Sequence, residues 1–452
     1  MLNSLEKRYG FWTAVAMVVG IVIGSGVFFK AEKVIQITDG NIYIGIFSWI
    51  ASGSIMVICA YAFSILAGRY SKVNGIVDYS EASFGKTYGY IVGWFMSVVY
   101  YPSLTAILCW ISARYTLTLF GINIGANSTE VYVIGIIYLV LICALNIFAP
   151  MLAGKIQVST TFIKLIPLVL MGVIGIIKGI SNGQIVQNFV SVSTDIVTSN
   201  SIFGAIVATA FAYEGWIVAT TINSELKNSR KDLPKALIVG SIFIVVVYTL
   251  YFIGISGPLS VNDFIQGGED SIKHAFFNIL GNFGGSTLFI FVIISCLGTL
   301  NGMMLATIRG LYSLSIRGMG PCPKFFSKVS EKTNLPVNSG LFGVIIVFIW
   351  ILLWYLSNKG FFGLFLDFSE LPVISMYALY IPIFLCMSRK LEGLNIFNKY
   401  IIPYAAVVCS LFMIYATILS HGIVAVSLYF VLFVFVIVVG LIFKNGSKKE
   451  SL

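Results

Sequence analysis

Residues 20–28 read GIVIGSGVF and lie in the middle of an apolar run that begins at Phe11 and continues to about residue 35. Gly20, Gly24 and Gly26 permit non-helical backbone in a segment long enough to cross a bilayer. A break at that depth frees backbone N–H and C=O groups, which are tolerated only where protein or a watery cavity satisfies them. The glycines equally fit close packing between helices, so this stretch alone leaves both interpretations open.

The chemistry of such a break is specific. The start of a half-helix presents N–H groups that attract a carboxylate, and the end of a half-helix presents C=O groups that attract an ammonium. An amino acid zwitterion carries both charges a few ångströms apart. If the run is broken near Gly24 and Gly26, we expect a binding site for such a molecule.

The composition places the whole chain in a membrane. The 452 residues are 58% hydrophobic and 10% charged, and the mean hydropathy is +0.96. A soluble domain carries roughly 25% charged residues, so this chain cannot cover a globular surface with solvated groups. Runs of about 20 apolar residues predict an all-α protein with twelve transmembrane helices. The twelve runs lie near 11–35, 41–68, 86–113, 131–150, 156–178, 200–223, 235–256, 281–312, 338–358, 361–386, 400–419 and 422–443.

The basic residues predict the orientation. With twelve spans, 21 of the 28 Lys and Arg residues fall on one side, six on the other, and Lys164 lies within a span. This is the positive-inside pattern, and it predicts a multi-pass protein of the cell (inner) membrane with both termini in the cytoplasm. It also accounts for the net charge of +10 without a nucleic-acid partner. The polar start, MLNSLEKRYG, precedes the first apolar run without a cleavage site, so we expect no removed signal peptide.

A second candidate break lies at residues 211–216, FAYEGW. Here Glu214 and Gly215 interrupt an apolar run, and an acid at membrane depth costs at least about 2.5 kcal/mol. The alternative is a packed aromatic cluster in which Glu214 bonds to neighbouring helices. Interrupted segments at matching positions of two halves indicate a transporter built from inverted repeats. Because the two candidates are five spans apart, their pairing favours a central transport site.

Lys164 is the third candidate. It follows Lys155 by nine residues, which places it about 13 Å along a helix and too deep for easy snorkelling. A tilted helix that brings the lysine to the cytoplasmic interface is the alternative. The functional interpretation is a fixed cation that donates to the free carbonyls of the broken first span. It would then stand where other transporters hold a sodium ion.

Other chemistry is not indicated. The seven cysteines are odd in number and mostly lie in apolar runs, so they do not form a disulfide framework. His274 and His421 are far apart in the sequence, and we expect no metal site and no cofactor. No catalytic constellation or soluble signalling domain is visible, which argues against an enzyme or a sensor.

Several polar residues are weaker candidates. Asp367 and Glu370 lie near the outer start of the tenth span, where we expect them at the membrane interface. Four tyrosines are expected to be packing or interfacial residues: Tyr100, Tyr101, Tyr248 and Tyr251.

Four motifs in order resemble the amino acid–polyamine–organocation superfamily, and within it the bacterial relatives of the L-type amino acid transporters, of the serine/threonine or alanine/serine/cysteine exchanger kind. They are IGSGVF (23–28), NGIVDYSEASFG (74–85) with Gly93-Trp94, FAYEGW (211–216) with SELKNSRKDLPK (224–235), and SCLGTLNG (295–302) with residues 309–321. The likeness covers nearly the whole chain. It implies a LeuT-like fold with inverted five-span repeats at 1–180 and 181–390, followed by two extra spans and a cytoplasmic tail at 391–452.

The resemblance also implies roles for residues. The substrate carboxylate would meet N–H groups at Ser25, Gly26 and Val27. The ammonium would meet carbonyls near Ile21 and at Phe211, Ala212 and Glu214, with Phe211 as an aromatic gate. Lys164 matches the family's lysine in the fifth span, which implies sodium-independent exchange or facilitated transport of small or medium neutral L-amino acids by alternating access.

Departures from the family pattern limit these implications. The second motif has Asn74-Gly75 where a double glycine is usual, and Glu214 stands where many animal relatives have glycine. Animal members bind a heavy subunit through a cysteine in the outer loop after the third span. Residues 119–131, LFGINIGANSTEV, contain no cysteine, so we expect no disulfide-linked subunit. A proton-coupled or polyamine/organocation carrier of the same fold remains the alternative.

Overall fold

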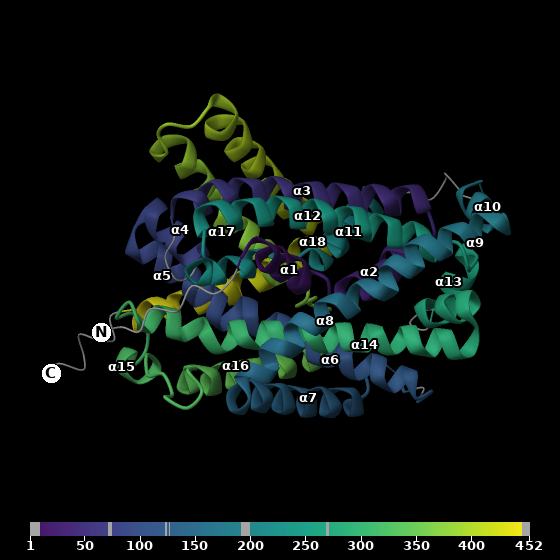
Figure 1. Ribbon diagram of the computed structural model, residues 1–452, viewed down its shortest axis with the longest axis horizontal. Coiled ribbons are helices and arrows are strands. Elements are labelled where there is room, and N and C mark those ends of the chain that lie inside the picture. The colour runs from purple at the N-terminus through teal and green to yellow at the C-terminus, as the bar shows by residue number, and fades with distance from the viewer. Residues whose placement is uncertain are drawn as a thin grey trace.

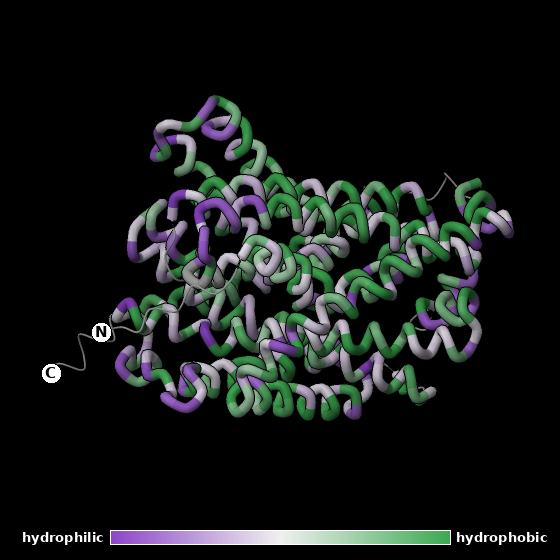
Figure 2. Tube along the Cα trace, viewed as in Figure 1, coloured by the Kyte–Doolittle hydropathy of each residue, from purple (hydrophilic) through white to green (hydrophobic). Residues whose placement is uncertain are grey.

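The structure is a computed structural model that describes residues 10–70, 75–122, 124–125, 127–190, 199–267 and 271–444. These residues form helices and no β-strand. Long helices run side by side along the long axis of the molecule (Figure 1). Hydrophobic residues dominate the middle of this bundle and hydrophilic residues gather near its two ends, as expected for helices that cross a bilayer (Figure 2).

The first half of the described chain contains eight α-helices of ten or more residues, α1 to α8, and four shorter helical elements. They are α1 (Phe11–Val22), α2 (Gly26–Ile37), α3 (Ile42–Arg69), α4 (Gly75–Phe84), α5 (Lys86–Phe95), η1 (Met96–Tyr100), α6 (Tyr101–Leu119), α7 (Thr129–Phe148), α8 (Pro150–Leu170), η2 (Met171–Gly175), α9 (Ile176–Ser181) and α10 (Gln184–Val190). The α5–η1–α6 segment is continuous and contains a π-helical turn at η1.

The second half repeats the mixture of long helices and short connecting ones. Its elements are α11 (Ser199–Ala212), η4 (Trp216–Glu225), α12 (Ser229–Ile255), α13 (Val261–Gly267), α14 (Ser271–Ser315), α15 (Pro323–Phe326), α16 (Val337–Asn358), α17 (Leu371–Lys390), η6 (Phe397–Ile401) and α18 (Ile402–Phe443). Helices α14 and α18 each contain one non-helical glycine, Gly281 and Gly422 respectively.

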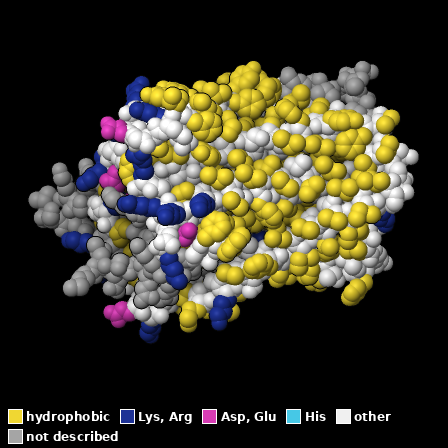
Figure 3. All heavy atoms as spheres, turned by 45° about the horizontal axis from the view of Figure 1, so that its top comes forward, with side chains coloured by type: hydrophobic (Ala, Val, Ile, Leu, Met, Phe, Trp, Pro, Cys, Tyr) yellow, Lys and Arg dark blue, Asp and Glu magenta, His cyan; other side chains and the backbone are white. Residues whose placement is uncertain are grey.

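The outer surface is apolar around the middle of the bundle. Large hydrophobic side chains such as Leu141 on α7, Phe162 on α8 and Val431 on α18 are exposed. Figure 3 shows hydrophobic side chains over most of one face, with Lys and Arg gathered toward the end that carries α4 and α15. An apolar surface of this extent on a folded chain is explained by contact with lipid.

The spans agree with the sequence in kind and differ in count. Within the described residues, ten helices are long and apolar enough to cross a membrane, or eleven if the bent pair α1 and α2 forms one span. Twelve were predicted because 400–419 and 422–443 were taken as separate spans. In the structure, Phe397–Phe443 contains two helices that meet at a kink at Gly422, and the count of ten or eleven takes this whole stretch as one span. The count of twelve therefore stays a prediction.

One expectation near the predicted tenth span is wrong. The run 361–386 was expected to be helical from its start, but α17 begins only at Leu371. The chain before it turns at Gly360 and Gly363, both of which have positive φ. Asp367 and Glu370 are buried inside the protein at 3% and 2% exposure, and their expected depth at the membrane interface stays a prediction. Lysines far away in the sequence surround these carboxylates, which sequence spacing alone does not show.

Some predictions fall outside the described residues. These are Asn74 of the second motif and the two chain termini with their basic residues. The described part of the second motif forms α4, whose Asp78 is buried.

The contact between α12 and η2 yields a test of the packing. Backbones approach so closely there that a Cβ at Gly254 would lie 2.3 Å from the Met171 carbonyl oxygen and 2.7 Å from the Gly172 Cα. We expect Gly254→Ala to lower the free energy of unfolding by about 1–3 kcal/mol, because backbone atoms cannot give way as a flexible side chain does. The measurement is the thermal midpoint in detergent, followed by size-exclusion chromatography.

Gly154→Ala is the matched control for this substitution. Gly154 lies within α8 and a Cβ there meets nothing within 4 Å. Its thermal midpoint should stay unchanged or rise slightly, since alanine is the better helix former. Equal losses in the two variants would contradict the close contact between α12 and η2.

Candidate functional site

The first span is interrupted in the middle of the molecule. Helix α1 ends at Val22, residues 23–25 are not helical, and α2 begins at Gly26 with its axis bent by 43° from that of α1. The end of a helix leaves carbonyl groups without partners in the helix, and the start of a helix leaves N–H groups without partners. The interruption therefore presents both kinds of group inside the protein.

Three side chains from three other helices donate to the carbonyls of the interruption. The Nζ of Lys164 on α8 is fully buried and lies 2.7 Å from the Gly20 carbonyl oxygen. The Tyr248 hydroxyl on α12 donates to Val22 O at 3.0 Å, and the Thr299 hydroxyl on α14 lies 3.2 Å from Ile23 O. The Lys164 ammonium also donates to Thr299 Oγ1 at 2.9 Å. These bonds hold the non-helical segment against the bundle.

The second interruption lies in the segment that follows α11. Helix α11 ends at Ala212, residues 213–215 form a turn, and a 3₁₀ helix starts at Trp216. Gly215 has φ +101°, a left-handed conformation that favours glycine. The N–H of Glu214 donates to the Phe211 carbonyl at 3.1 Å, so one lone pair of that carbonyl is already used.

The two interruptions face one another. A Cβ on Gly26 would lie 2.7 Å from the Ala212 Cα, and a Cβ on Gly215 would lie 2.9 Å from the Ile21 Cγ2. Glycine at both positions therefore lets the backbones of the two segments approach within contact distance.

A cavity with an empty volume of about 380 Å³ lies between these segments. Eight of the ten residues that the sequence singled out line it: Ile21, Gly24, Ser25, Gly26, Phe211, Ala212, Glu214 and Gly215. The other two do not line it. Val27 is fully buried in α2, and Lys164 lies behind the first interruption, where it bonds to Gly20.

The remaining cavity wall was not predicted from the sequence. Leu104 and Leu108 come from α6, Thr299 and Met303 from α14, and Val22 from the end of α1. Leucines and methionines in an apolar span resemble every other core residue, so no local signal distinguishes them. Thr299 lies inside the fourth motif, where its neighbours Gly298 and Gly302 mark close helix packing.

Two polar groups on the cavity wall define its chemistry. Ser25 is the N-cap of α2, yet its hydroxyl makes no capping bond and finds no hydrogen-bond partner among the described residues. The Glu214 carboxyl is buried and accepts a hydrogen bond from the Tyr100 hydroxyl, which comes from the π-helical turn η1. Tyr100 was expected to be a packing or interfacial residue, and its contact with Glu214 is a polar role that the sequence did not reveal.

No group of three or more His, Cys, Asp or Glu side chains suited to a metal ion occurs in the described residues. The cavity wall thus contains the N-terminus of α2 with the free Ser25 hydroxyl and the interruption after α11. It also contains the Glu214 carboxyl bound to Tyr100, and its other side chains are mainly apolar. A small molecule that carries both a carboxylate and an ammonium matches this arrangement of donors and acceptors.

The interruptions generate a prediction about stability. Gly215→Ala should lower the free energy of unfolding by more than Gly281→Ala, with a difference of about 1 kcal/mol or more. Both glycines have positive φ, but a Cβ meets Ile21 at position 215 and nothing within 4 Å at position 281. Thermal midpoints of both purified variants measure the difference. Equal midpoints would mean that the two interruptions are not in contact.

Comparison with known proteins places the chain among transporters. The family model described as "amino acid permease" matches residues 9–445. The serine/threonine exchanger SteT of Bacillus subtilis is 28% identical over 382 residues, which are 84% of this chain and 83% of that protein. The mouse b(0,+)-type amino acid transporter 1 is 26% identical over 429 residues, 93% of this chain and 84% of that protein. The human cystine/glutamate transporter is 24% identical over 335 residues, 74% of this chain and 66% of that protein.

Proposed function

Since this chain belongs to the amino acid permease family, a family of transporters and not of enzymes, we propose that it carries small or medium neutral L-amino acids by alternating access, through sodium-independent exchange or facilitated transport. The membership confirms the resemblance drawn from the four motifs. The substrate class is a separate proposal, because the names of the relatives give different substrates, from serine and threonine to cystine and glutamate.

The observation that carries the proposal is the start of α2 on the cavity wall. N–H groups at Ser25, Gly26 and Val27 and the free Ser25 hydroxyl would bind the substrate carboxylate. Of these three, Val27 would contribute its backbone only, since its side chain is buried away from the cavity.

The ammonium of the substrate would bind on the opposite side of the cavity. The carbonyls near Ile21 and at Phe211, Ala212 and Glu214 belong to the two helix ends that meet there. Helix C-terminal ends carry partial negative charge, so a cation is stabilised at this place. Phe211 would cover the bound molecule as an aromatic gate.

The remaining lining favours a neutral side chain of modest size. Leu104, Leu108 and Met303 are apolar, and the one ionisable lining residue, Glu214, is bonded to Tyr100. A short uncharged side chain of the substrate would pack against these leucines and this methionine.

Sodium independence is supported by Lys164. Its ammonium bonds to Gly20 O and to Thr299, so a fixed cation already satisfies the carbonyl end of the first interruption. A sodium ion bound there would have to compete with a charge that cannot diffuse away.

We further propose the LeuT-like architecture. Residues 1–180 and 181–390 would form the inverted repeats, and each repeat would begin with an interrupted span. Among the described residues the candidate spans number eleven with the bent pair counted as one, and they would number twelve if the Gly422 kink separates two spans. Lys and Arg gather at the end with α4 and α15 (Figure 3), which supports a cytoplasmic location of that end. The proposed membrane is a bacterial inner membrane, with both termini in the cytoplasm. The absence of a disulfide-linked subunit also stays a proposal.

Glu214 supports the second candidate, an amine or organocation carrier that is coupled to protons. Its carboxyl lies on the cavity wall and would attract a cationic substrate. Competition of labelled amino acid uptake by amines that lack a carboxylate distinguishes this candidate. Strong competition would favour it over the leading proposal.

The first test is uptake by the purified protein in proteoliposomes. We expect uptake of labelled small neutral L-amino acids, faster with unlabelled substrate inside and unchanged when potassium replaces sodium. A panel of neutral, acidic, basic and N-acetylated amino acids reports selectivity, and the N-acetylated forms test the ammonium site. The proposal fails if no amino acid enters under any gradient.

The second test concerns Lys164. We expect Lys164→Ala to reduce uptake at least about 10-fold while the protein still inserts and purifies, because the Gly20 carbonyl and Thr299 hydroxyl lose a charge-assisted partner worth roughly 1.5–3 kcal/mol. Lys155→Ala on the same helix removes an exposed ammonium and should transport like the parent. Parent-like uptake by Lys164→Ala would remove this residue from the mechanism.

A further inference from the structure

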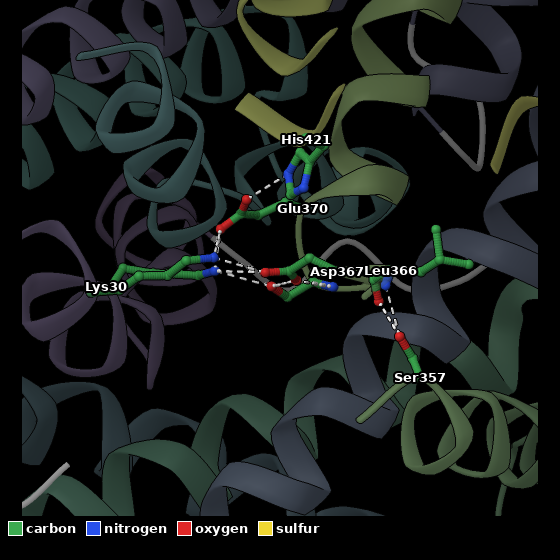
Figure 4. Close-up of polar contacts among 8 residues, drawn as sticks. Lys30, Ser357, Leu366, Asp367, Glu370 and His421 are labelled. Atoms are coloured by element: carbon green, nitrogen blue, oxygen red, sulfur yellow. Dashed lines mark hydrogen bonds and ion pairs between the residues drawn. The ribbon is translucent and has the colours of Figure 1, made fainter. Parts of the chain in front are cut away.

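Four charged side chains meet between α2 and the segment before α17. Lys30 Nζ lies 2.5 Å from Glu370 Oε1, and Lys33 Nζ lies 2.7 Å from the same oxygen. Lys33 also bonds to Asp367 Oδ2 at 2.8 Å, and Lys30 is 3.8 Å from that atom. With the polar residues bound to them they form what we call the outer ion cluster: Lys30, Lys33, Asp367, Ser369, Glu370 and His421 (Figure 4).

Glu370 is the centre of the outer ion cluster. Its Oε1 accepts from both lysines, and its Oε2 lies 2.9 Å from His421 Nε2 (Figure 4). His421 belongs to α18 and directly precedes the kink at Gly422. One carboxylate therefore joins α2, α17 and α18, and it is only 2% exposed.

The acidic half of the cluster is fixed to the bundle. The hydroxyl of Ser357 near the end of α16 donates to Leu366 O at 2.9 Å and accepts from Leu366 N at 2.8 Å. Within the loop, Ser369 N donates to Asp367 Oδ1 at 2.9 Å. These bonds hold the backbone next to Asp367 independently of α2.

The basic half of the cluster sits on a short helix that follows the interruption of the first span. Helix α2 has 12 residues, and the non-helical residues 23–25 precede it. Lys30 Nζ also lies 5.0 Å from the centre of the Phe211 ring, and Phe211 lines the cavity. The outer ion cluster therefore adjoins the cavity wall at Phe211, and Figure 1 shows α2 extending from α1 away from the end with α4 and α15.

We propose that the outer ion cluster is a reversible latch that holds α2 closed over the cavity on the outer side, with Glu370 as its central residue. The inference rests on the proposed alternating access, since a latch has meaning only if the outer side opens. Burying charges is costly, and their mutual attraction offsets that cost in the closed state. When α2 moves away from the fixed acids, water hydrates every charge. Breaking the contacts therefore costs little free energy.

The latch is tested by access to the cavity, which does not require a known substrate. The substitution Leu108→Cys on the cavity wall reports access to a membrane-impermeant thiol reagent added from the outer side of right-side-out vesicles. Cys322→Ser removes the exposed native cysteine, and the same background without the Leu108 cysteine gives the background labelling. We expect Glu370→Gln to raise the labelling rate from the outer side at least about 5-fold, because the neutral amide weakens its contacts with both lysines and with His421.

Two variants control for general loss of a carboxylate. Asp263→Asn neutralises an acid on α13 that bonds to Ser260 and not to the cluster. Asp78→Asn breaks a buried ion pair with Arg317 at the other end of the bundle. Both should label from the outer side like the parent. An equal rise in Asp263→Asn would show that the effect is not specific and would overturn the latch.

Charge exchange supplies the reverse experiment. Lys33→Glu and Asp367→Lys should each raise labelling, and the double variant should return it toward the parent rate, since it restores alternating charges. If Glu370→Gln does not purify as a monodisperse protein, Lys33→Met provides the same test on a side chain that is 28% exposed. A parent-like labelling rate in these folded variants overturns the proposal, whether or not amino acid uptake is observed.

Discussion

The structure depends on how three carbonyl groups are satisfied where the first span is interrupted. A carbonyl without a partner in the hydrocarbon region costs several kcal/mol, so a helix cannot simply stop at mid-membrane. Lys164, Tyr248 and Thr299 supply the missing donors from α8, α12 and α14. The donors to the three carbonyls are side chains of the protein itself and not a diffusible ion. The interruption therefore needs no bound ion to satisfy these carbonyls. This constraint places three helices around the end of α1 and leaves the start of α2 available to a ligand.

Helix α2 carries part of the proposed substrate site and part of the outer ion cluster. Its first turn presents N–H groups to the cavity, and Lys30 follows Gly26 by four residues, roughly 6 Å along the axis. A carboxylate that binds at the first turn and carboxylates that bind Lys30 and Lys33 act on the same short rigid element. In the proposed mechanism, substrate binding and outer closure therefore act on the same helix. Phe211 contacts both regions, since it lines the cavity and lies beside Lys30.

The sequence predicted features whose signal is local. Glycines in an apolar run, an acid beside a glycine and a lysine deep in a span are each anomalous on their own, so the interruptions and Lys164 could be named in advance. Tyr248 and Thr299 could not, because tyrosine and threonine are ordinary in membrane helices and their partners lie 226 and 276 residues away in the chain. The same limit explains Asp367 and Glu370. Position near the start of a span suggested the interface, and only the fold brings Lys30 and Lys33 to them.

Ion pairs, and not apolar contacts, join α2 to the acidic loop at the outer closure, and there is a physical reason for this difference. An apolar contact between α2 and the acidic loop would be stabilised by exclusion of water, so separation into a wet pathway would always be unfavourable. An ion pair has nearly balanced terms, since hydration on opening compensates the attraction lost. Helix α2 also makes apolar contacts with the bundle, such as Phe28 against Tyr251. In the proposed latch, charges at the surface that separates therefore let α2 open without a large change in free energy.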